Sequence, residues 1–196
     1  MSRHTADAVR DDVEIRHGGL ESDAVQALLR QHLDDMQLHS PSEDIHALDL
    51  HGLQGPGLDV WAAWRGDALL GCCALHELDA THGEIKSMRT APAHRGTGVA
   101  LRMMEHLLAV AARRGYTRLS LETGSAAAFA PARSLYARFG FVPCGPFDQY
   151  VDSPHSVFMT KPLEARDGEG DALRPAALSP LGEQLRPMDA AATSAD

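Results

Sequence analysis

The sequence has few cysteines and no long apolar run, and each shortage excludes a class of protein. Only three cysteines, Cys72, Cys73 and Cys144, occur in 196 residues. Two are adjacent and there is no CxxC pair, so we predict neither a disulfide framework nor a zinc site. No apolar stretch approaches the ~20 residues that a membrane-spanning helix needs, and the polar residues 1–12 lack a signal-peptide pattern. We therefore expect a reduced, cytoplasmic protein that does not enter the membrane.

An excess of positive charge is also missing. The formal net charge is −9, which argues against non-specific binding of nucleic acid, because such binding needs a basic face. A local basic pocket for a phosphorylated ligand stays compatible with this charge. The chain is 44% hydrophobic and 23% charged, values typical of a globular protein, and its length suits one domain with a real core.

Composition divides the chain into three parts. Residues 165–196 are rich in Ala, Pro, Gly and acidic residues and show no sustained period, which predicts a disordered acidic tail. Residues 1–12 are expected to form a flexible N-terminal segment. Residues 13–164 are left as one folded domain.

Within that domain, helical and strand periods alternate along the chain. Helices are predicted at 22–38, with Ser22 or Asp23 as the cap, at about 98–114 and at 131–138, and a shorter helical or irregular segment before Leu53. Strands are predicted at 13–16, 59–64, 68–78, 84–90, 119–121, from 141, and at 157–160. A helix between the strands at 84–90 and 119–121 allows these two to pair in parallel. The fold class expected is α/β, with a mixed, mostly antiparallel sheet and helices on both faces.

The segment His94–Ala100 carries the most informative local pattern. Gly96 and Gly98 lie between a strand and the strongest amphipathic helix of the chain. Glycine lets the backbone approach a ligand, and the start of a helix presents unpaired N–H groups and a positive dipole end. Together with Arg95 these features suit a pyrophosphate. A simple tight turn explains the glycines equally well, and neither a Walker A loop nor a Rossmann fingerprint fits.

Four segments in order extend this pattern into a family resemblance. Arg95–Ala100 fits the Arg/Gln-x-x-Gly-x-Gly/Ala signature of the GNAT superfamily of N-acetyltransferases. The strand Glu84–Thr90 precedes it and the strand Leu119–Thr123 follows the helix, as in that superfamily. Ala132–Phe141 matches its Ala-x-x-Leu-Tyr-x-x-x-Gly-Phe motif. The resemblance covers residues 13–162.

The resemblance implies acetyl-CoA as cosubstrate, with no metal. Its signature loop would bind the pyrophosphate through the backbone of Arg95, Gly96, Thr97, Gly98, Val99 and Ala100. Met88 and Thr90 would bond the pantetheine amides with their backbone, on a strand that a bulge separates from its parallel neighbour. A backbone N–H there would polarise the thioester carbonyl.

Two arginines are weaker candidates for the cofactor. Arg89 would reach a phosphate, or it is a solvated strand residue. Arg133, with Pro131, would contact the pantetheine or adenosine arm. The sequence departs from the family pattern after the Leu119 strand, where an asparagine is common and Thr123–Ser125 stands instead.

The catalytic groups follow from the same resemblance. Tyr136 matches the usual general acid, which protonates the leaving thiolate; a packing role for this tyrosine is the alternative. For the base, which must deprotonate the acceptor amine, Glu84 is the first choice, directly or through water. A solvated carboxylate at a strand end is the alternative interpretation, and the rival bases are His76, His82 and Glu122.

The acceptor is the least determined part. In this family the first two helices cover it, here about Gln31–Leu53, whose acidic groups would attract a cationic amine. An ordinary solvated face is the alternative. Phe129, Phe147 and Tyr150 would add an aromatic wall there, or belong to the core.

The function predicted is acetyl transfer from acetyl-CoA to an amine of a small molecule by direct attack. The alternatives are a non-catalytic module that binds or senses acyl-CoA, and a nucleotide-binding regulatory domain. The family resemblance makes a homodimer possible.

Overall fold

A single twisted sheet organises the residues that the structure, a computed structural model, describes, namely 12–38 and 49–164. Within them seven strands pair in the order β1-β2-β3-β4-β5-β7-β6. The strands are β1 (Glu14–His17), β2 (Leu58–Arg65), β3 (Ala68–Asp79), β4 (His82–Thr90), β5 (Arg118–Gly124), β6 (Val142–Cys144) and β7 (Ser156–Pro162). The helices are α2 (Asp23–Gln37), α3 (Val99–Arg113) and α4 (Ala130–Arg138), with short 3₁₀ turns η2 (Gly52–Gln54), η3 (Pro92–His94) and η4 (Ala127–Phe129).

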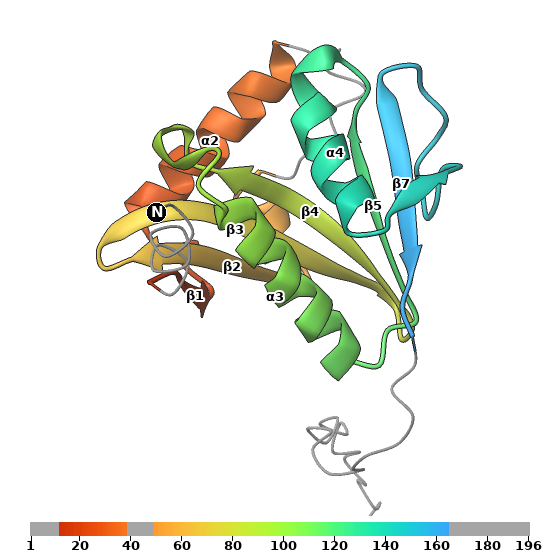
Figure 1. The fold of residues 1–196 in the computed structure, drawn as a ribbon, viewed down its shortest axis with the longest axis horizontal. Helices are drawn as coiled ribbons and strands as arrows, with labels where there is room; N and C mark the ends of the chain where they lie inside the picture. The colour runs from red at the N-terminus through yellow and green to blue at the C-terminus, as the bar shows by residue number, and fades with distance from the viewer. Residues whose placement is uncertain (1–11, 39–48, 165–196) are drawn as a thin grey trace, which may run out of the picture. The chain divides into compact units, whose positions relative to one another are not determined.

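The central pair, β4 and β5, is parallel, and the other neighbouring strands are antiparallel. The helix α3 joins β4 to β5, as a parallel crossover requires. Their pairing runs from His82 opposite Arg118 to Ile85 opposite Leu121 and stops there. Beyond this point β4 continues on β3 and β5 continues on β7, so the two strands diverge (Figure 1).

A bulge in β4 lies where the divergence begins. Cys72 of β3 pairs with Arg89 and Ala74 pairs with Lys86, so one residue of β3 lies opposite two residues of β4, Ser87 and Met88. Ser87 has a φ of 49°, in the left-handed region that a residue with a Cβ seldom adopts. The bulge implied by the family resemblance is therefore present.

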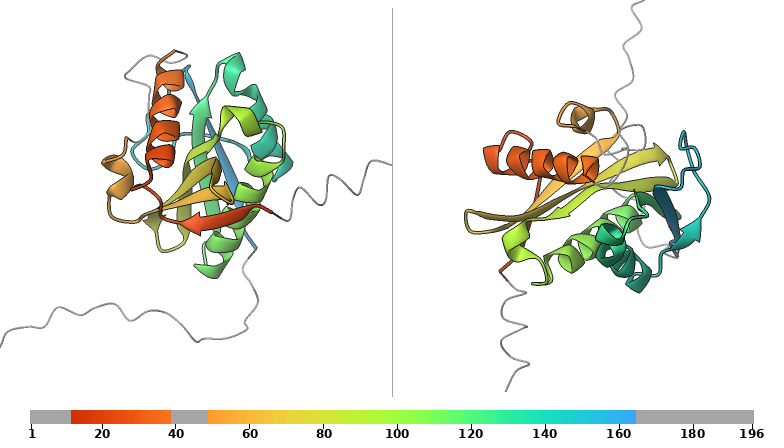
Figure 2. Two further views of the ribbon diagram at one scale, coloured as in Figure 1. Left: turned by 90° about the vertical axis from the view of Figure 1, so that its left-hand side faces the viewer. Right: turned by 90° about the horizontal axis from the view of Figure 1, so that it is seen from above.

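Helix α2 covers one face of the sheet and α3 and α4 cover the other (Figure 2). Each face has its own core. On one face α2 packs Val25, Leu28 and Leu29 against β2 and β3. On the other face α3 packs Met103, Met104 and Leu107 against the sheet centre. Because side chains alternate along a strand, Cys72 belongs to the first core and Cys73 to the second, as their adjacent positions predict.

The predicted elements are confirmed, with shifts at their ends. The helix predicted from 22 begins at Asp23. Ser22, one of the two expected caps, occupies the N-cap position, but its side chain makes no capping bond. Residues 39–48, which hold most of the expected shorter helical or irregular segment, lie outside the described residues; η2 follows them. No helix of the described residues is long and apolar enough to cross a membrane.

Candidate active site

The divergence of β4 and β5 opens a cavity of about 510 Å³. Its walls come from α2, from β4 and β5, from the start of α3 and from α4 with the turn before it. The lining residues that concern the chemistry are His32, Asp35, Glu84, Lys86, Ser87, Met88, Arg89, Thr90, Arg95, Gly96, Ala100, Glu122, Thr123, Tyr136 and Tyr150. A cavity of this size, with both apolar and charged walls, is typical of a small-molecule site.

One end of this cavity is the glycine turn before α3. Gly96 and Gly98 have φ values of 76° and 90°, so both adopt the left-handed backbone for which glycine is suited. Gly98 directly precedes the helix, whose first N–H groups receive no side-chain cap. Arg95 is half-exposed at the cavity edge. The turn therefore presents backbone donors and a cation to the cavity.

Two residues of the signature can offer a ligand only their backbone groups, because their side chains are already engaged. Thr97 donates its side-chain hydroxyl to the carbonyl of His94 at 2.7 Å. Val99 is buried in the core beneath α3. This arrangement agrees with the implied role of the loop, in which backbone amides contact the phosphates.

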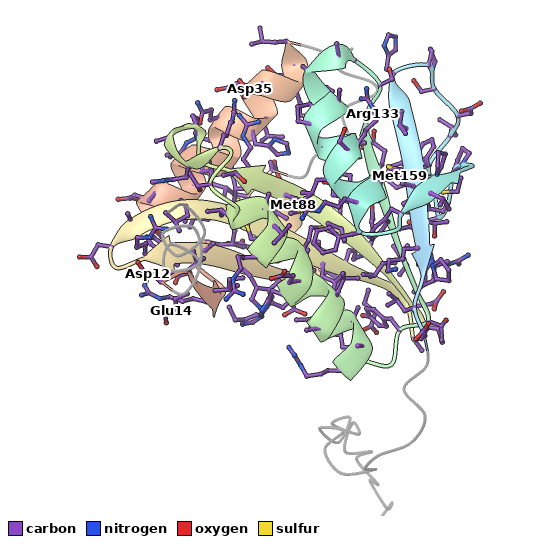
Figure 3. The ribbon with its side chains drawn as sticks, in the orientation of Figure 1. Asp12, Glu14, Asp35, Met88, Arg133 and Met159 are labelled. Atoms are coloured by element: carbon purple, nitrogen blue, oxygen red, sulfur yellow. The ribbon has the colours of Figure 1, made fainter. Side chains whose placement is uncertain are left out.

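Further into the cavity, β4 presents different side chains to its two faces. Met88 packs against the core on the α3 face. Arg89 lies on the α2 face and donates Nη2 to the carboxylate of Asp35 on α2. Asp35 of α2 and Arg133 of α4 lie at the end where the strands have diverged (Figure 3).

Tyr136 lies on α4, is 7% exposed and lines the cavity. Burial raises the pKa of its phenol, and the nearby Cys73 and Glu122 raise it further. The phenol therefore keeps its proton at neutral pH, which a general acid must do.

Glu84 is 2% exposed on β4 and stands in a hydrogen-bonded cluster. Its Oε1 accepts a bond from Lys86 Nζ at 2.9 Å and another from the hydroxyl of Tyr150. Lys86 also donates to the Tyr150 oxygen at 2.7 Å, and His76 Nδ1 lies 3.6 Å from Glu84 Oε2. Burial and the adjacent Glu84 raise the pKa of Tyr150 well above its usual range. The interpretation of Glu84 as a solvated strand-end carboxylate is wrong, because its side chain is buried and bonded.

A second cavity, of about 360 Å³, adjoins this cluster. Residues 52–58, His76 and residues 148–150 form its walls, and Glu84, Lys86 and Tyr150 line both cavities. Asp148, on its wall, has a φ of 51°. The Glu84 cluster thus forms a shared boundary between the two cavities.

The rival bases are separated by the fold. Glu122 lines the larger cavity and His76 the smaller one. His82 contacts neither, because its Nε2 bonds Ser120 Oγ at 2.8 Å and its Nδ1 lies 3.0 Å from an Arg118 nitrogen. Burial, together with Arg118, lowers the pKa of His82.

Arg133 does not line the larger cavity. It donates Nη1 to the carbonyls of Gly124 and Ala126, at 2.6 and 3.0 Å, and so ties the end of β5 to the start of α4. Ser125 donates its hydroxyl to the carbonyl of Pro154 at 2.7 Å. Thr123 and Pro131 do line the cavity.

Lys86 is a site residue that the sequence reasoning missed, and the polar role of Tyr150 was missed with it. Residues two apart on a strand share a face, so Glu84 and Lys86 carried a readable signal of proximity. Tyr150 carried none, because it lies in a loop 66 positions along the chain from Glu84. Of the aromatic wall considered, Phe129 and Tyr150 line the larger cavity, and Phe147 packs on Tyr150 with ring centres 5.0 Å apart.

The sequence is similar to that of known proteins. Residues 23–141 match the sequence profile of the Acetyltransferase (GNAT) family. The chain belongs to this family. It is 53% identical over 151 residues to the uncharacterized N-acetyltransferase YsnE of Bacillus subtilis, covering 77% of this chain and all of the relative. The N-acetyltransferase YedL of Escherichia coli is 45% identical over 149 residues, covering 76% of this chain and 94% of that protein.

Solved structures agree with this assignment. A Klebsiella pneumoniae structure described as an acyl-CoA N-acyltransferase superposes with a TM-score of 0.63 at 27% identity, covering 78% of this chain and 98% of its own. A Bacillus subtilis acetyltransferase solved in complex with CoA shares the fold, with a TM-score of 0.58 at 19% identity over 78% and 99% of the two chains. The GNAT chain described here is thus an acyltransferase with the fold of its family.

Proposed function

We propose that this GNAT enzyme transfers the acetyl group of acetyl-CoA to an amine of a small molecule by direct attack. One observation carries the proposal. The parallel strands β4 and β5 diverge at a bulge, and the cavity they open runs from the glycine turn at Gly96 to Tyr136 and Glu84. The family membership and the structural neighbour with CoA support the same cosubstrate.

The residues present fit acetyl-CoA along this cavity. The uncapped start of α3 and residues Arg95 to Ala100 would bind the pyrophosphate. The backbone of Met88 and Thr90, freed from pairing with β5, would bond the pantetheine amides. Arg89 donates to Asp35 on the α2 face, so the phosphate contact expected for it is not part of this proposal. For Arg133 the role is indirect, since it holds the chain that carries Thr123 and Pro131 to the cavity wall.

The chemistry needs a base, an oxyanion donor and an acid. Glu84 takes the proton of the acceptor ammonium, directly or through water, and Lys86 and Tyr150 orient its carboxylate. The neutral amine attacks the thioester carbon, while a backbone N–H at the bulge stabilises the oxyanion. The C–N bond forms, the C–S bond breaks, and Tyr136 gives its proton to the departing thiolate. The attacking nitrogen then loses its second proton, which returns through water to Tyr136, and Glu84 releases the first to solvent.

The acceptor reaches this point from the face of the sheet that α2 covers. The smaller cavity opens on the Glu84 cluster, and Asp148 on its wall adds a second carboxylate near Glu84. Negative charge here attracts a protonated amine. The cavity volume suits a small molecule rather than a protein tail.

Calorimetric titration with acetyl-CoA, CoA and ATP tests the cofactor site, with Gly98→Glu as the variant. Acetyl-CoA is expected to bind at micromolar strength, ATP is not, and Gly98→Glu is expected to abolish binding. The matched control is Gly115→Glu, at the other end of α3, where the glycine φ is also positive. A folded wild type that ignores acetyl-CoA contradicts the proposal.

A further inference from the structure

Three buried polar atoms on one wall of the larger cavity have no hydrogen-bond partner among the described residues. They are Nδ1 of His32 on α2 and, on β4, Oγ of Ser87 and Nε of Arg89. All three residues line the cavity. An unpaired buried polar atom costs about 1–3 kcal/mol, and three such atoms on residues of one cavity wall could be paired by a single ligand.

The chemistry of the three atoms favours an anion. Arg89 is a cation whose side chain is only 14% exposed, and Asp35 holds its Nη2, which leaves Nε–H as an unused donor. The hydroxyl of Ser87 and the imidazole of His32 can also donate. Burial, and then the charge of Arg89, lower the pKa of His32 to about 4, so the ring is neutral at physiological pH. Charge and donors together suit an oxygen anion.

The position of these atoms points to the acceptor rather than to the phosphates. Arg89 pairs with Cys72, which belongs to the core beneath α2, so it lies on the face that α2 covers. Ser87 precedes Met88, and consecutive Cα atoms are about 3.8 Å apart. An anion at Ser87 therefore lies close to the thioester that Met88 would hold. The pyrophosphate turn lies beyond the end of β4.

We propose that His32, Ser87 and Arg89 bind the carboxylate of the acceptor, so that the acceptor class is the α-amino acids. In these compounds one carbon separates the amine from the carboxylate, which matches an anion site beside the residue that holds the thioester. Asp35 orients Arg89 for this contact. The inference rests on the proposed function and adds the class of its acceptor.

Matched substrate pairs test the proposal. The release of CoA thiol is measured with the twenty common amino acids and with four decarboxylated partners: phenethylamine, histamine, tryptamine and cadaverine. Two or three charge-assisted bonds, each worth about tenfold, predict that an accepted amino acid exceeds its amine by about 100- to 1000-fold in kcat/KM. The variants His32→Phe and Ser87→Ala are expected to lower that ratio about tenfold each.

Two controls come from the same chain. His106 Nε2 and Ser156 Oγ are also buried and unpaired among the described residues, yet neither residue lines either cavity. The variants His106→Phe and Ser156→Ala should therefore keep the wild-type ratio. Calorimetry with acetyl-CoA is run on all four variants, so that an effect on the cosubstrate is separated from an effect on the acceptor.

The outcomes are distinct. The inference is overturned if the amines are acetylated as fast as their amino acids. It is also overturned if His32→Phe and Ser87→Ala leave the amino-acid-to-amine ratio of kcat/KM unchanged. In both cases the proposed function stands. If the variants weaken acetyl-CoA binding and keep the amino-acid-to-amine ratio, the three unpaired atoms contact a phosphate of CoA. That result also overturns the inference. If no amino acid is acetylated or binds the protein saturated with CoA, the inference is wrong. If the wild-type protein binds no acetyl-CoA, the proposed function itself is wrong, and the inference that rests on it is wrong as well.

Discussion

At the scale of single residues, the two proposed catalytic groups are both buried but in different surroundings. Tyr136 packs near Phe141, with ring centres 6.1 Å apart, and lines only the larger cavity. Glu84 bonds Lys86 and Tyr150 and borders both cavities. An acid isolated in an apolar wall and a base in a polar cluster suit the two opposite proton transfers of acetyl transfer.

Replacing Tyr136 by Phe removes the proton donor and keeps the ring. We expect kcat to fall by about 100-fold or more, because general acid catalysis contributes about 10²–10⁴. The affinity for acetyl-CoA should stay within about twofold. Steady-state assays of CoA release measure kcat, and calorimetric titration measures the affinity for acetyl-CoA. A protein that binds acetyl-CoA and shows no turnover before the mutation would instead be the non-catalytic sensor.

The neutral His32 predicts a pH dependence of stability. Its folded pKa is about 4 and its ordinary value is 6.5, so below pH 6.5 the unfolded chain binds a proton that the folded chain does not. The stabilisation is complete above pH 6.5 and is lost as the pH falls toward 4. At pH 5 wild type should lose about 1–2 kcal/mol more than His32→Phe, relative to pH 7. Urea unfolding of both proteins at the two pH values measures this, and equal losses would refute it.

At the scale of elements, the turn before α3 and the bulge in β4 are the two local features that make the site. The turn depends on glycines with positive φ, and the bulge lets β4 leave β5 without leaving β3. Arg133 provides a third local feature. Its two hydrogen bonds to backbone carbonyls fix the path of the chain from β5 to α4. The expectation that Arg133 contacts the cofactor thus gives way to a proposal that it supports the wall.

The turn can be tested with two glycines that flank α3, one before and one after the helix. Gly96 and Gly115 have φ values of 76° and 74°, and a Cβ at either would meet no atom within 4 Å. Each Gly→Ala change should therefore cost a similar ~1–2 kcal/mol of unfolding free energy. Only Gly96→Ala places a methyl group on the cavity wall, so it alone should weaken acetyl-CoA binding, by about tenfold or more. Similar affinities of the two variants would show that the turn does not contact the cosubstrate.

At the scale of the whole molecule, the sheet separates two cores, and each core lies beneath the site proposed for one of the two substrates. The α3 face supports the turn and strand proposed for acetyl-CoA, and the α2 face carries His32 and Asp35 toward the acceptor. Each core contains a fully buried leucine: Leu107 on the α3 face is 0% exposed and Leu29 on the α2 face is 2% exposed. The division predicts that damage to one core affects one substrate more than the other.

Leu29→Ala and Leu107→Ala compare the two cores. Each should lower the free energy of unfolding by about 2–5 kcal/mol, the usual cost of a buried leucine. Leu29→Ala loosens α2 and is expected to raise the KM of the acceptor by severalfold, with little change in the affinity for acetyl-CoA. Leu107→Ala should show the reverse pattern. Steady-state kinetics at a temperature where both variants are folded measures this; a common effect on both substrates would contradict it.

Local patterns predicted much of this protein because they depend on neighbours in the chain. The apolar period of α3, the alternation in β3 and the glycines at 96 and 98 each report on a few consecutive residues. Their order along the chain identified the family and the parallel pair. Tyr136 and Glu84 were proposed as catalytic groups in this way, since each lies within or beside a motif.

The tertiary structure decided which side chains meet. Glu84 and Tyr150 are 66 positions apart, and Arg89 and Asp35 are 54 apart, so their contacts depend on strand register and helix packing. Whether Arg133 faces a cofactor or a carbonyl, and whether His32 keeps an unpaired nitrogen in a cavity, depends on the same long-range geometry. The sequence by itself determined the elements, their order and the glycine turn before α3, because these are local. Only the packed sheet decided the partners of each charge, because a buried group is stabilised by whichever groups the fold brings beside it.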